Sequence, residues 1–194
     1  MFNTEVLKSR SGLSSTELLE ISSPFGLDRE VYPLLIVGMR GYYLDSLGQE
    51  GINDRGIYDD ALFIDSPNGT VCYHANTDPS AFRKGWGTDK SKGMARLKPG
   101  LWKVHQFGMH KNYEALVQIK GEVSVIRDGD PDYEDTGYFG INIHKGSYNG
   151  TSSSGCQTIY PEQWQSFIGL AKSEAVRLFG LRWNNVVIPY LLVE

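Results

Sequence analysis

The chain has 194 residues, of which 40% are hydrophobic and 12% aromatic, so it can bury the core of one domain and is unlike a disordered protein. Its formal net charge is −4, with no basic stripe and no single-sign tail, which argues against nucleic-acid binding. Two cysteines make no disulfide framework, although a single bridge between Cys72 and Cys156 stays open. Four scattered histidines match no zinc pattern, so we expect no metal and no cofactor.

The N-terminus lacks the apolar core of a secretory signal, and no run approaches the roughly 18 apolar residues of a membrane-spanning helix. We therefore expect synthesis in the cytoplasm without a signal peptide. A substrate in the periplasm or cell wall would require release by lysis, a holin or a secretion machine.

Residues 1–30 are rich in serine and predict an N-terminal arm or a short helix, because Ser14 and Glu17 have the spacing of a capping box. Residues 31–194 are expected to form a single domain. Twenty-two glycines, eleven tyrosines and many turn pairs favour a mainly β fold with one or two helices, as a sandwich or mixed sheet.

Residues 31–44 predict a strand that is broken at Gly38 and Gly41, and a polar loop follows. Apolar runs at residues 61–65 and 70–74 flank an Asn-Gly turn, the strongest short-range signal of a hairpin. Residues 76–93 predict a long irregular loop.

Further along, residues 101–105 alternate as a strand does, and residues 115–119 and 122–127 predict a second hairpin around Lys120-Gly121. An acidic turn over residues 128–136 and a strand over residues 138–144 come next. Pro161 then begins the best helix of the chain. Its apolar face has helical spacing and consists of Trp164, Phe167, Ile168, Ala171 and Ala175. Residues 185–193 are β-like.

A histidine and a cysteine stand 12 positions apart in the middle of this pattern. His144 ends the predicted strand, a loop rich in glycine and serine follows, and Gly155 precedes Cys156. An imidazole that takes the thiol proton makes the sulfur a strong nucleophile, and the N–H groups of a sharply bent loop can stabilise an oxyanion. This pattern indicates acyl transfer through a thioester. The alternative is an inert buried thiol at Cys156 and an ordinary polar residue at His144.

The order of these segments resembles a known family. The hairpin, the segment KPGLWKV at residues 98–104, the pair His144 and Gly146, and the loop SSGC that ends at Cys156 are similar to the L,D-transpeptidase catalytic domain. The likeness covers roughly residues 57–165. It implies a β-rich fold and a cysteine peptidase or acyltransferase that acts on peptidoglycan stem peptides.

The resemblance also implies roles for single residues. Cys156 would be the nucleophile and His144 the base, while Ser153 would hold the loop or orient the imidazole. Gly155 and Ser154 would contribute to the oxyanion site. The expected substrate-binding residues are Tyr138, Lys145, Gly146, Arg96 and Trp86. Thr158 replaces the arginine or asparagine that helps to bind a substrate carboxylate in the family, so Arg96 or Lys145 is expected to supply that contact.

The reaction expected from the resemblance is hydrolysis of a stem amide, with transpeptidation as the variant in which an amine replaces water. Compact relatives of this kind occur in phage and among secreted effectors, so a delivery partner or an immunity protein is an expected partner. The competing interpretation is a non-catalytic phage structural or peptidoglycan-binding module that retains the fold.

Overall fold

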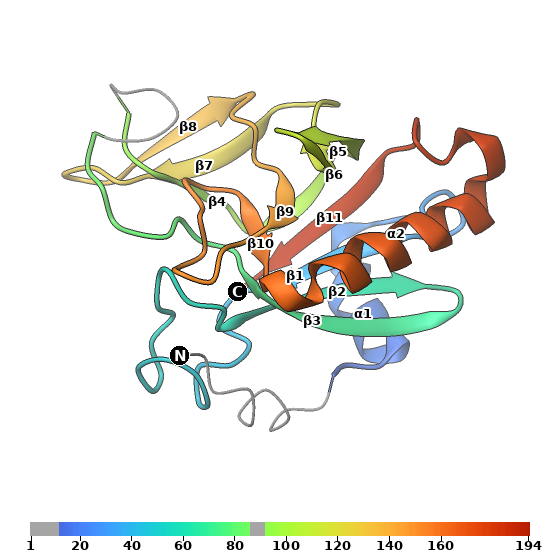
Figure 1. Cartoon of the computed structure of the whole chain (residues 1–194), viewed down its shortest axis with the longest axis horizontal. Coiled ribbons are helices and arrows are strands. Elements are labelled where there is room, and N and C mark those ends of the chain that lie inside the picture. The colour runs from blue at the N-terminus through green and yellow to red at the C-terminus, as the bar shows by residue number, and fades with distance from the viewer. Residues whose placement is uncertain (1–11, 86–91) are drawn as a thin grey trace.

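The computed structural model describes residues 12–85 and 92–194, and in them it is mainly β, as predicted (Figure 1). Eight strands close into a barrel in the order β1-β11-β5-β6-β9-β10-β3-β2. These strands are β1 (Leu35–Met39), β2 (Asp60–Ser66), β3 (Gly69–Asn76), β5 (Gly100–His110), β6 (Tyr113–Gln118), β9 (Ile143–Lys145), β10 (Gln157–Ile159) and β11 (Ile188–Val193). A separate three-stranded sheet has the order β4-β7-β8 and contains β4 (Ala95–Leu97), β7 (Val123–Arg127) and β8 (Tyr133–Gly137).

Two α-helices accompany the strands. Helix α1 (Ser15–Ser22) begins with the predicted capping box, in which Ser14 Oγ accepts from the Glu17 N–H and the Glu17 carboxylate accepts from the Ser14 N–H, and it runs into the short η2 (Ser23–Phe25). Helix α2 (Trp164–Phe179) follows a turn of 3₁₀ helix, η3 (Pro161–Gln163), and ends at η4 (Gly180–Arg182). All five residues of its predicted apolar face are buried, which confirms the helical periodicity.

The barrel strands separate two apolar clusters because successive side chains point to opposite faces. Ile36 and Leu62 belong to the larger cluster, which also receives the apolar face of α2 and the inner residues of β4 and β7. Val37 and Phe63 belong to the second cluster, where Leu18 of α1 is fully buried. The N-terminal helix therefore packs on the outside of β1 and β2, and α2 packs with the larger core.

The Asn-Gly hairpin is confirmed, since β2 and β3 pair in continuous register from Asp60↔Ala75 to Ser66↔Gly69. The second predicted hairpin is wrong. Strand β6 pairs with β5 and β9, whereas β7 pairs with β4 and β8 in the other sheet. The chain leaves the barrel at residues 119–122, so two neighbouring strands in sequence are not neighbours in space.

Three smaller expectations are also corrected. Strand β1 continues through Gly38, where a Cβ atom would lie 2.1 Å from Tyr190 Oη, so this glycine permits close packing and does not break the strand. The predicted acidic turn contains most of β8, whose exposed strand residues lack an apolar pattern. Of the strand expected at residues 138–144, only Ile143 and His144 are extended, at the start of β9.

Candidate active site

The parallel pairing of β9 with β10 brings the histidine and the cysteine onto neighbouring strands. Ile143 pairs with Gln157, and His144 pairs with Thr158. Paired residues of parallel strands point to the same face, and Cys156 lies one residue before β10. Cys156 is two residues before Thr158, which is the partner of His144 in the register of the two strands. The long loop between the histidine and the cysteine therefore returns the chain to the strand beside His144, with Cys156 directly before β10.

The thiol of Cys156 is half-buried and donates a hydrogen bond to the carbonyl of Gly140 at 3.2 Å. It lines a small pocket of about 20 Å³ together with Ala95, Phe139, Gly140, Ile141, Ser154 and Gly155. A space of this size admits one water molecule. The thiol thus borders on a space of about the size of one water molecule, and it does not hydrogen-bond to His144 in this structure.

The imidazole of His144 forms hydrogen bonds through Nδ1 and makes none through Nε2 within the described residues. Nδ1 lies 2.8 Å from the carbonyl oxygen of Lys145 and 3.3 Å from Tyr113 Oη. A carbonyl only accepts, so Nδ1 carries the proton and Nε2 is the unprotonated nitrogen of the neutral ring. Burial, together with the charges of His110 and Lys111, lowers the pKa of His144 to about 4. The ring is neutral at pH 7 and can accept a proton on Nε2.

The sequence predicted a thiol that an imidazole ionises, and the electrostatics of the resting site are different. Burial raises the pKa of the Cys156 thiol to about 11, against smaller opposing effects of the Asn142 backbone and the charge of Lys111. The resting pair therefore consists of a neutral thiol and a neutral imidazole. Because the thiol is not ionised before the reaction, its proton has to pass to the imidazole while the sulfur attacks the substrate.

A second histidine, His110 at the end of β5, lies flat against His144 with ring centroids 4.1 Å apart and ring planes 9° apart. Asn142 fixes its orientation. The side-chain oxygen of Asn142 accepts from the Gln118 N–H at 2.9 Å, so its amide nitrogen is the atom that donates to His110 Nδ1 at 3.1 Å. The catalytic candidate His144 is thus confined between a stacked ring and the Lys145 carbonyl.

The loop before the cysteine is fixed by Ser153, whose contacts are all within the loop or with its support. Its hydroxyl donates to the Cys156 carbonyl at 2.7 Å and accepts from the Gly155 N–H at 3.0 Å. Of the two expected roles, these contacts support holding the loop, and Ser153 makes no hydrogen bond to the imidazole. Gly155 has φ +151°, and its Cβ position lies 2.3 Å from the Ala95 carbonyl, so a larger residue cannot take its place.

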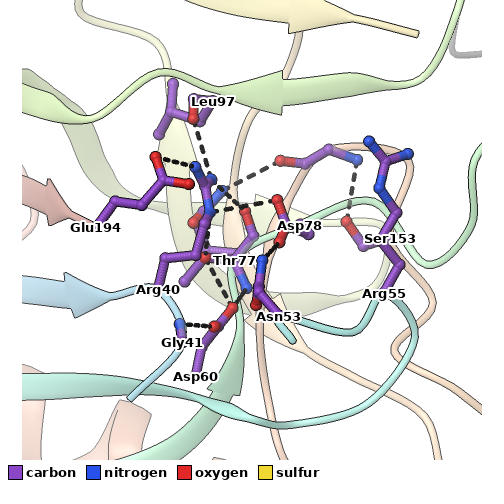
Figure 2. A network of polar contacts seen from close by, with 12 residues as sticks. Arg40, Gly41, Asn53, Arg55, Asp60, Thr77, Asp78, Leu97, Ser153 and Glu194 are labelled. Carbon is purple, nitrogen blue, oxygen red and sulfur yellow. Dashed lines mark hydrogen bonds and ion pairs between the residues drawn. The ribbon is translucent and has the colours of Figure 1, made fainter. Parts of the chain in front are cut away.

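A buried network of polar contacts around Arg40 extends to Ser153 of this loop (Figure 2). Arg40, which follows β1, donates from Nε to Thr77 Oγ1 at 3.1 Å and from Nη2 to the carbonyls of Thr77 and Leu97 at 3.1 and 3.0 Å. It forms an ion pair with Asp78 at 3.3 Å, and Asp60 accepts from the Thr77 hydroxyl at 2.8 Å. These contacts fix the chain at residues 77–78, immediately after β3.

Ser80 connects this network to the cysteine loop. Its N–H donates to the Ser153 carbonyl at 2.8 Å, its hydroxyl accepts from the Ser153 N–H at 2.7 Å, and the same hydroxyl lies 2.7 Å from Thr151 Oγ1. The position of the thiol therefore depends on a chain of polar contacts that begins at a buried arginine far away in sequence.

Among the expected substrate-binding residues, Lys145 contacts a neighbour of His144. Its Nζ is 5.6 Å from the centroid of the Tyr113 ring, which itself contacts His144. Gly146 has a packing role, because its Cβ position lies 2.1 Å from Tyr58 Oη, and that hydroxyl donates to the Ser147 carbonyl at 2.7 Å. Ser154 lines the pocket and its carbonyl accepts from the Ala95 N–H at 3.1 Å.

The other expected residues are not brought to the thiol. Ala95 and Leu97 point into the core, so Arg96 between them points to the opposite face of β4. Tyr138 is 63% exposed and does not line the pocket at Cys156. Trp86 lies outside the described residues. The carboxylate contact expected of Arg96 is thus unsupported by the direction of its side chain.

Sequence reasoning missed His110, Lys111, Tyr113 and Asn142, although all four surround the histidine. None of the four stands out in the sequence as a site residue. The sequence does show a short polar turn between two apolar segments, at residues 110–113. Only the pairing of β6 with β5 and β9 shows that this turn lies beside His144.

Within the described residues, no three His, Cys, Asp or Glu side chains converge as a metal site, and Cys72 and Cys156 are not joined by a disulfide. None of the helices described here has the length and hydropathy needed to cross a bilayer. No protein-family model, curated protein or solved structure matches this chain.

Proposed function

We propose that this protein is a cysteine-dependent acyl-transfer enzyme of L,D-transpeptidase type that hydrolyses an amide of peptidoglycan stem peptides. The observation that supports the proposal is the parallel pairing of β9 with β10, because Cys156 directly precedes the strand whose Thr158 pairs with His144. The hydrogen bond from His144 Nδ1 to the Lys145 carbonyl adds to it, because it leaves Nε2 free to accept a proton.

The first half of the reaction forms a thioester. Cys156 Sγ attacks the amide carbonyl carbon while its proton passes to His144 Nε2, and the carbonyl oxygen becomes an oxyanion. The C–N bond then breaks, and the imidazolium returns the proton to the leaving amine. Since the Gly155 N–H donates to Ser153 Oγ, the backbone N–H groups of Ser154 and Cys156 are the expected oxyanion donors.

The second half releases the acyl group. Water attacks the thioester carbonyl, His144 takes its proton, and the departing sulfur is reprotonated to give the free acid and the resting thiol. An amine in place of water gives exchange or cross-linking. Substrate has to bind beside the thiol. The hydrogen bond that Cys156 Sγ donates to the Gly140 carbonyl is therefore expected to break when substrate binds. In this proposal the protein works in the cell wall after lysis or secretion, with a delivery partner or an immunity protein.

The test is mass spectrometry of purified muropeptides incubated with the wild type, with Cys156→Ala and with His144→Gln. Loss of a terminal residue or a split between stems in the wild type, absent in both variants, supports the proposal. Near-ultraviolet circular dichroism of each variant checks that the fold is intact. Products that persist in Cys156→Ala, or their absence from an intact wild type, contradict it.

The second candidate is a non-catalytic module that binds peptidoglycan. It is favoured by the raised pKa of the Cys156 thiol and by the small size of the pocket that this thiol lines. In that case intact sacculi retain the wild type and Cys156→Ala equally, and no muropeptide changes mass. Sedimentation with sacculi measures this directly.

A further inference from the structure

Two hydrogen bonds in series cross the interior of the barrel and end at the residue before the thiol. Gln157 on β10 and Tyr190 on β11 are fully buried, although three strands separate β10 from β11 on either side of the ring. The Tyr190 hydroxyl donates to Gln157 Oε1 at 2.8 Å, and Gln157 Nε2 donates to the Gly155 carbonyl at 3.2 Å. The cysteine loop is therefore tied to the opposite wall of the barrel.

The direction of both bonds follows from the chemistry of the groups. A backbone carbonyl only accepts, so the amide nitrogen of Gln157 faces Gly155 and its oxygen faces Tyr190, whose hydroxyl has to donate. Burial raises the pKa of Tyr190 well above its ordinary value, so the hydroxyl keeps this proton at neutral pH. Two polar groups inside an apolar core cost free energy unless they are hydrogen-bonded, and here they are bonded to each other.

Strand β1 leaves the space that the Tyr190 hydroxyl occupies. A Cβ atom at Gly38 would lie 2.1 Å from Tyr190 Oη and 2.8 Å from Cζ of the same ring. Any larger residue at this position would displace the phenol. The glycine on β1 therefore fixes where the hydroxyl can stand, and the hydroxyl in turn fixes the amide of Gln157.

The bond to Gly155 orients the peptide group that carries the N–H of Cys156. This peptide is trans, and in a trans peptide the carbonyl and the following N–H point in opposite directions within one plane. Because the Gly155 carbonyl is held toward the side chain of Gln157, the Cys156 N–H points away from that side chain.

The N–H groups on either side of Cys156 are already engaged. The Gly155 N–H donates to Ser153 Oγ at 3.0 Å, and the Gln157 N–H donates to the Asn142 carbonyl at 2.8 Å. In the part of the chain that the structure describes, the Cys156 N–H makes no hydrogen bond. This donor is next to the thiol, has a fixed direction and remains available to a ligand.

We infer that Gln157, held by Tyr190, is a positioning residue that directs the Cys156 N–H at the oxyanion formed when the thiol attacks a carbonyl. The inference rests on the proposed function and deepens it. A donor that is oriented beforehand needs no reorganisation when the charge develops, and loss of one such donor costs on the order of 10²–10³ in rate. A misdirected donor loses part of that factor.

The test compares two reagents that modify Cys156 by different chemistry. With para-nitrophenyl acetate, the S–C bond forms through a tetrahedral oxyanion, the C–O bond breaks and nitrophenolate leaves, while the thiol proton passes to His144 or to solvent. With para-nitrobenzyl bromide, the thiol displaces bromide directly and no oxyanion forms. Both reagents need the same thiolate, so the ratio of acylation to alkylation reports the oxyanion site and not the thiol pKa. Peptide mass mapping after an acid quench measures both products.

Tyr190→Phe should lower this ratio about threefold, and Gln157→Leu should lower it at least tenfold, with the alkylation rate itself unchanged. The matched controls are Tyr73→Phe and Gln106→Leu. Each removes the same chemical group from a hydrogen bond elsewhere in the protein, and both should keep the wild-type ratio. A wild-type ratio in Gln157→Leu overturns the inference, and so does an equal fall in the controls. If Gln157→Leu does not fold, the ratio in Tyr190→Phe decides in the same way.

Turnover of muropeptides separates this inference from the proposed function. In an active enzyme, Gln157→Leu should lower kcat with little change in KM, because the oxyanion exists only after substrate has bound. Muropeptide hydrolysis with a ratio that does not depend on Gln157 overturns the inference and leaves the proposed function standing. A ratio that depends on Gln157, without any muropeptide product, contradicts the proposed function and supports the positioning role.

Discussion

The imidazoles of His110 and His144 are stacked at 4.1 Å, and this contact joins two elements that the sequence separates by more than thirty positions. His110 belongs to β5 and His144 to β9, with β6 between them in the barrel. The stack and the bond from Asn142 to His110 leave His144 few orientations. A base that is held in one orientation needs no reorganisation when it accepts a proton.

Removal of the stacked ring should lower turnover and leave the thiol in place. We expect His110→Ala to reduce kcat about tenfold, because His144 gains rotational freedom, while KM changes little. His110→Phe keeps an aromatic face and should recover most of the loss. The measurement is kcat and KM on the substrate identified by muropeptide analysis. If His110→Phe is as impaired as His110→Ala, stacking is not what positions the ring.

The reactivity of Cys156 should keep rising well above neutral pH. Burial raises the pKa of its thiol to about 11, so the fraction of thiolate and the rate of iodoacetamide labelling should increase tenfold per pH unit from pH 7 to about pH 10. Stopped-time mass mapping of the Cys156 peptide measures the profile. A plateau already reached at pH 7 would mean that thiol and imidazole form an ion pair at rest, as the sequence predicted.

Acid should destabilise the protein through its buried neutral histidines. Burial lowers the pKa of His105 to about 4. Between about pH 6.5 and pH 4 the imidazole is therefore protonated in the unfolded state and neutral in the folded state. The stability that His105 contributes is present above about pH 6.5 and is lost as pH falls towards 4, by about 3 kcal/mol. His144, with a pKa of about 4, acts in the same direction.

The comparison that isolates this effect is urea unfolding of the wild type and of His105→Gln at pH 7 and pH 4. Asp59, whose pKa burial raises to about 8, changes stability in the opposite sense, but it does so in both proteins and cancels. The wild type should lose more free energy of unfolding than His105→Gln over this interval. Equal losses would show that His105 takes up its proton without unfolding.

The buried network at Arg40 should be the most sensitive part of the support for the cysteine loop. Arg40→Met leaves Asp78 without its cation inside the protein, and we expect a loss of about 3–5 kcal/mol in the free energy of unfolding. Arg177→Met breaks the half-exposed ion pair with Glu174 on α2 and should cost at most about 1 kcal/mol. Similar losses in the two variants would contradict a special role for the network.

Local signals in the sequence were sufficient where one segment decides its own structure. The capping box at Ser14, the hairpin at Asn68-Gly69 and the apolar face of α2 were all predicted, because each depends on residues within a few positions of one another. The failures have the opposite character. Strands β6 and β7 look like a hairpin in sequence, but their partners are β5 and β9 on one side and β4 and β8 on the other.

The candidate site divides in the same way. The spacing of His144 and Cys156 and the small residues between them indicated a thiol and a base, and this inference used only the residue types and a 12-position interval. Arg96 was chosen as a carboxylate contact for its charge, and the alternation of β4 directs its side chain elsewhere. Lys111 has no sequence signal, since nothing local places the turn of a hairpin beside a distant histidine.

What the sequence determined by itself is the mainly β character, the N-terminal cap, the Asn-Gly hairpin and the helix α2, together with the identity of two candidate reactive side chains, because periodicity, capping and chemical type are properties of short segments. The tertiary structure alone decided which strands pair, that His144 and Cys156 come to two neighbouring strands, and that burial keeps both neutral. These follow from closure of the barrel. Closure brings distant segments together and removes water from around them, and charge and proton affinity depend on those surroundings.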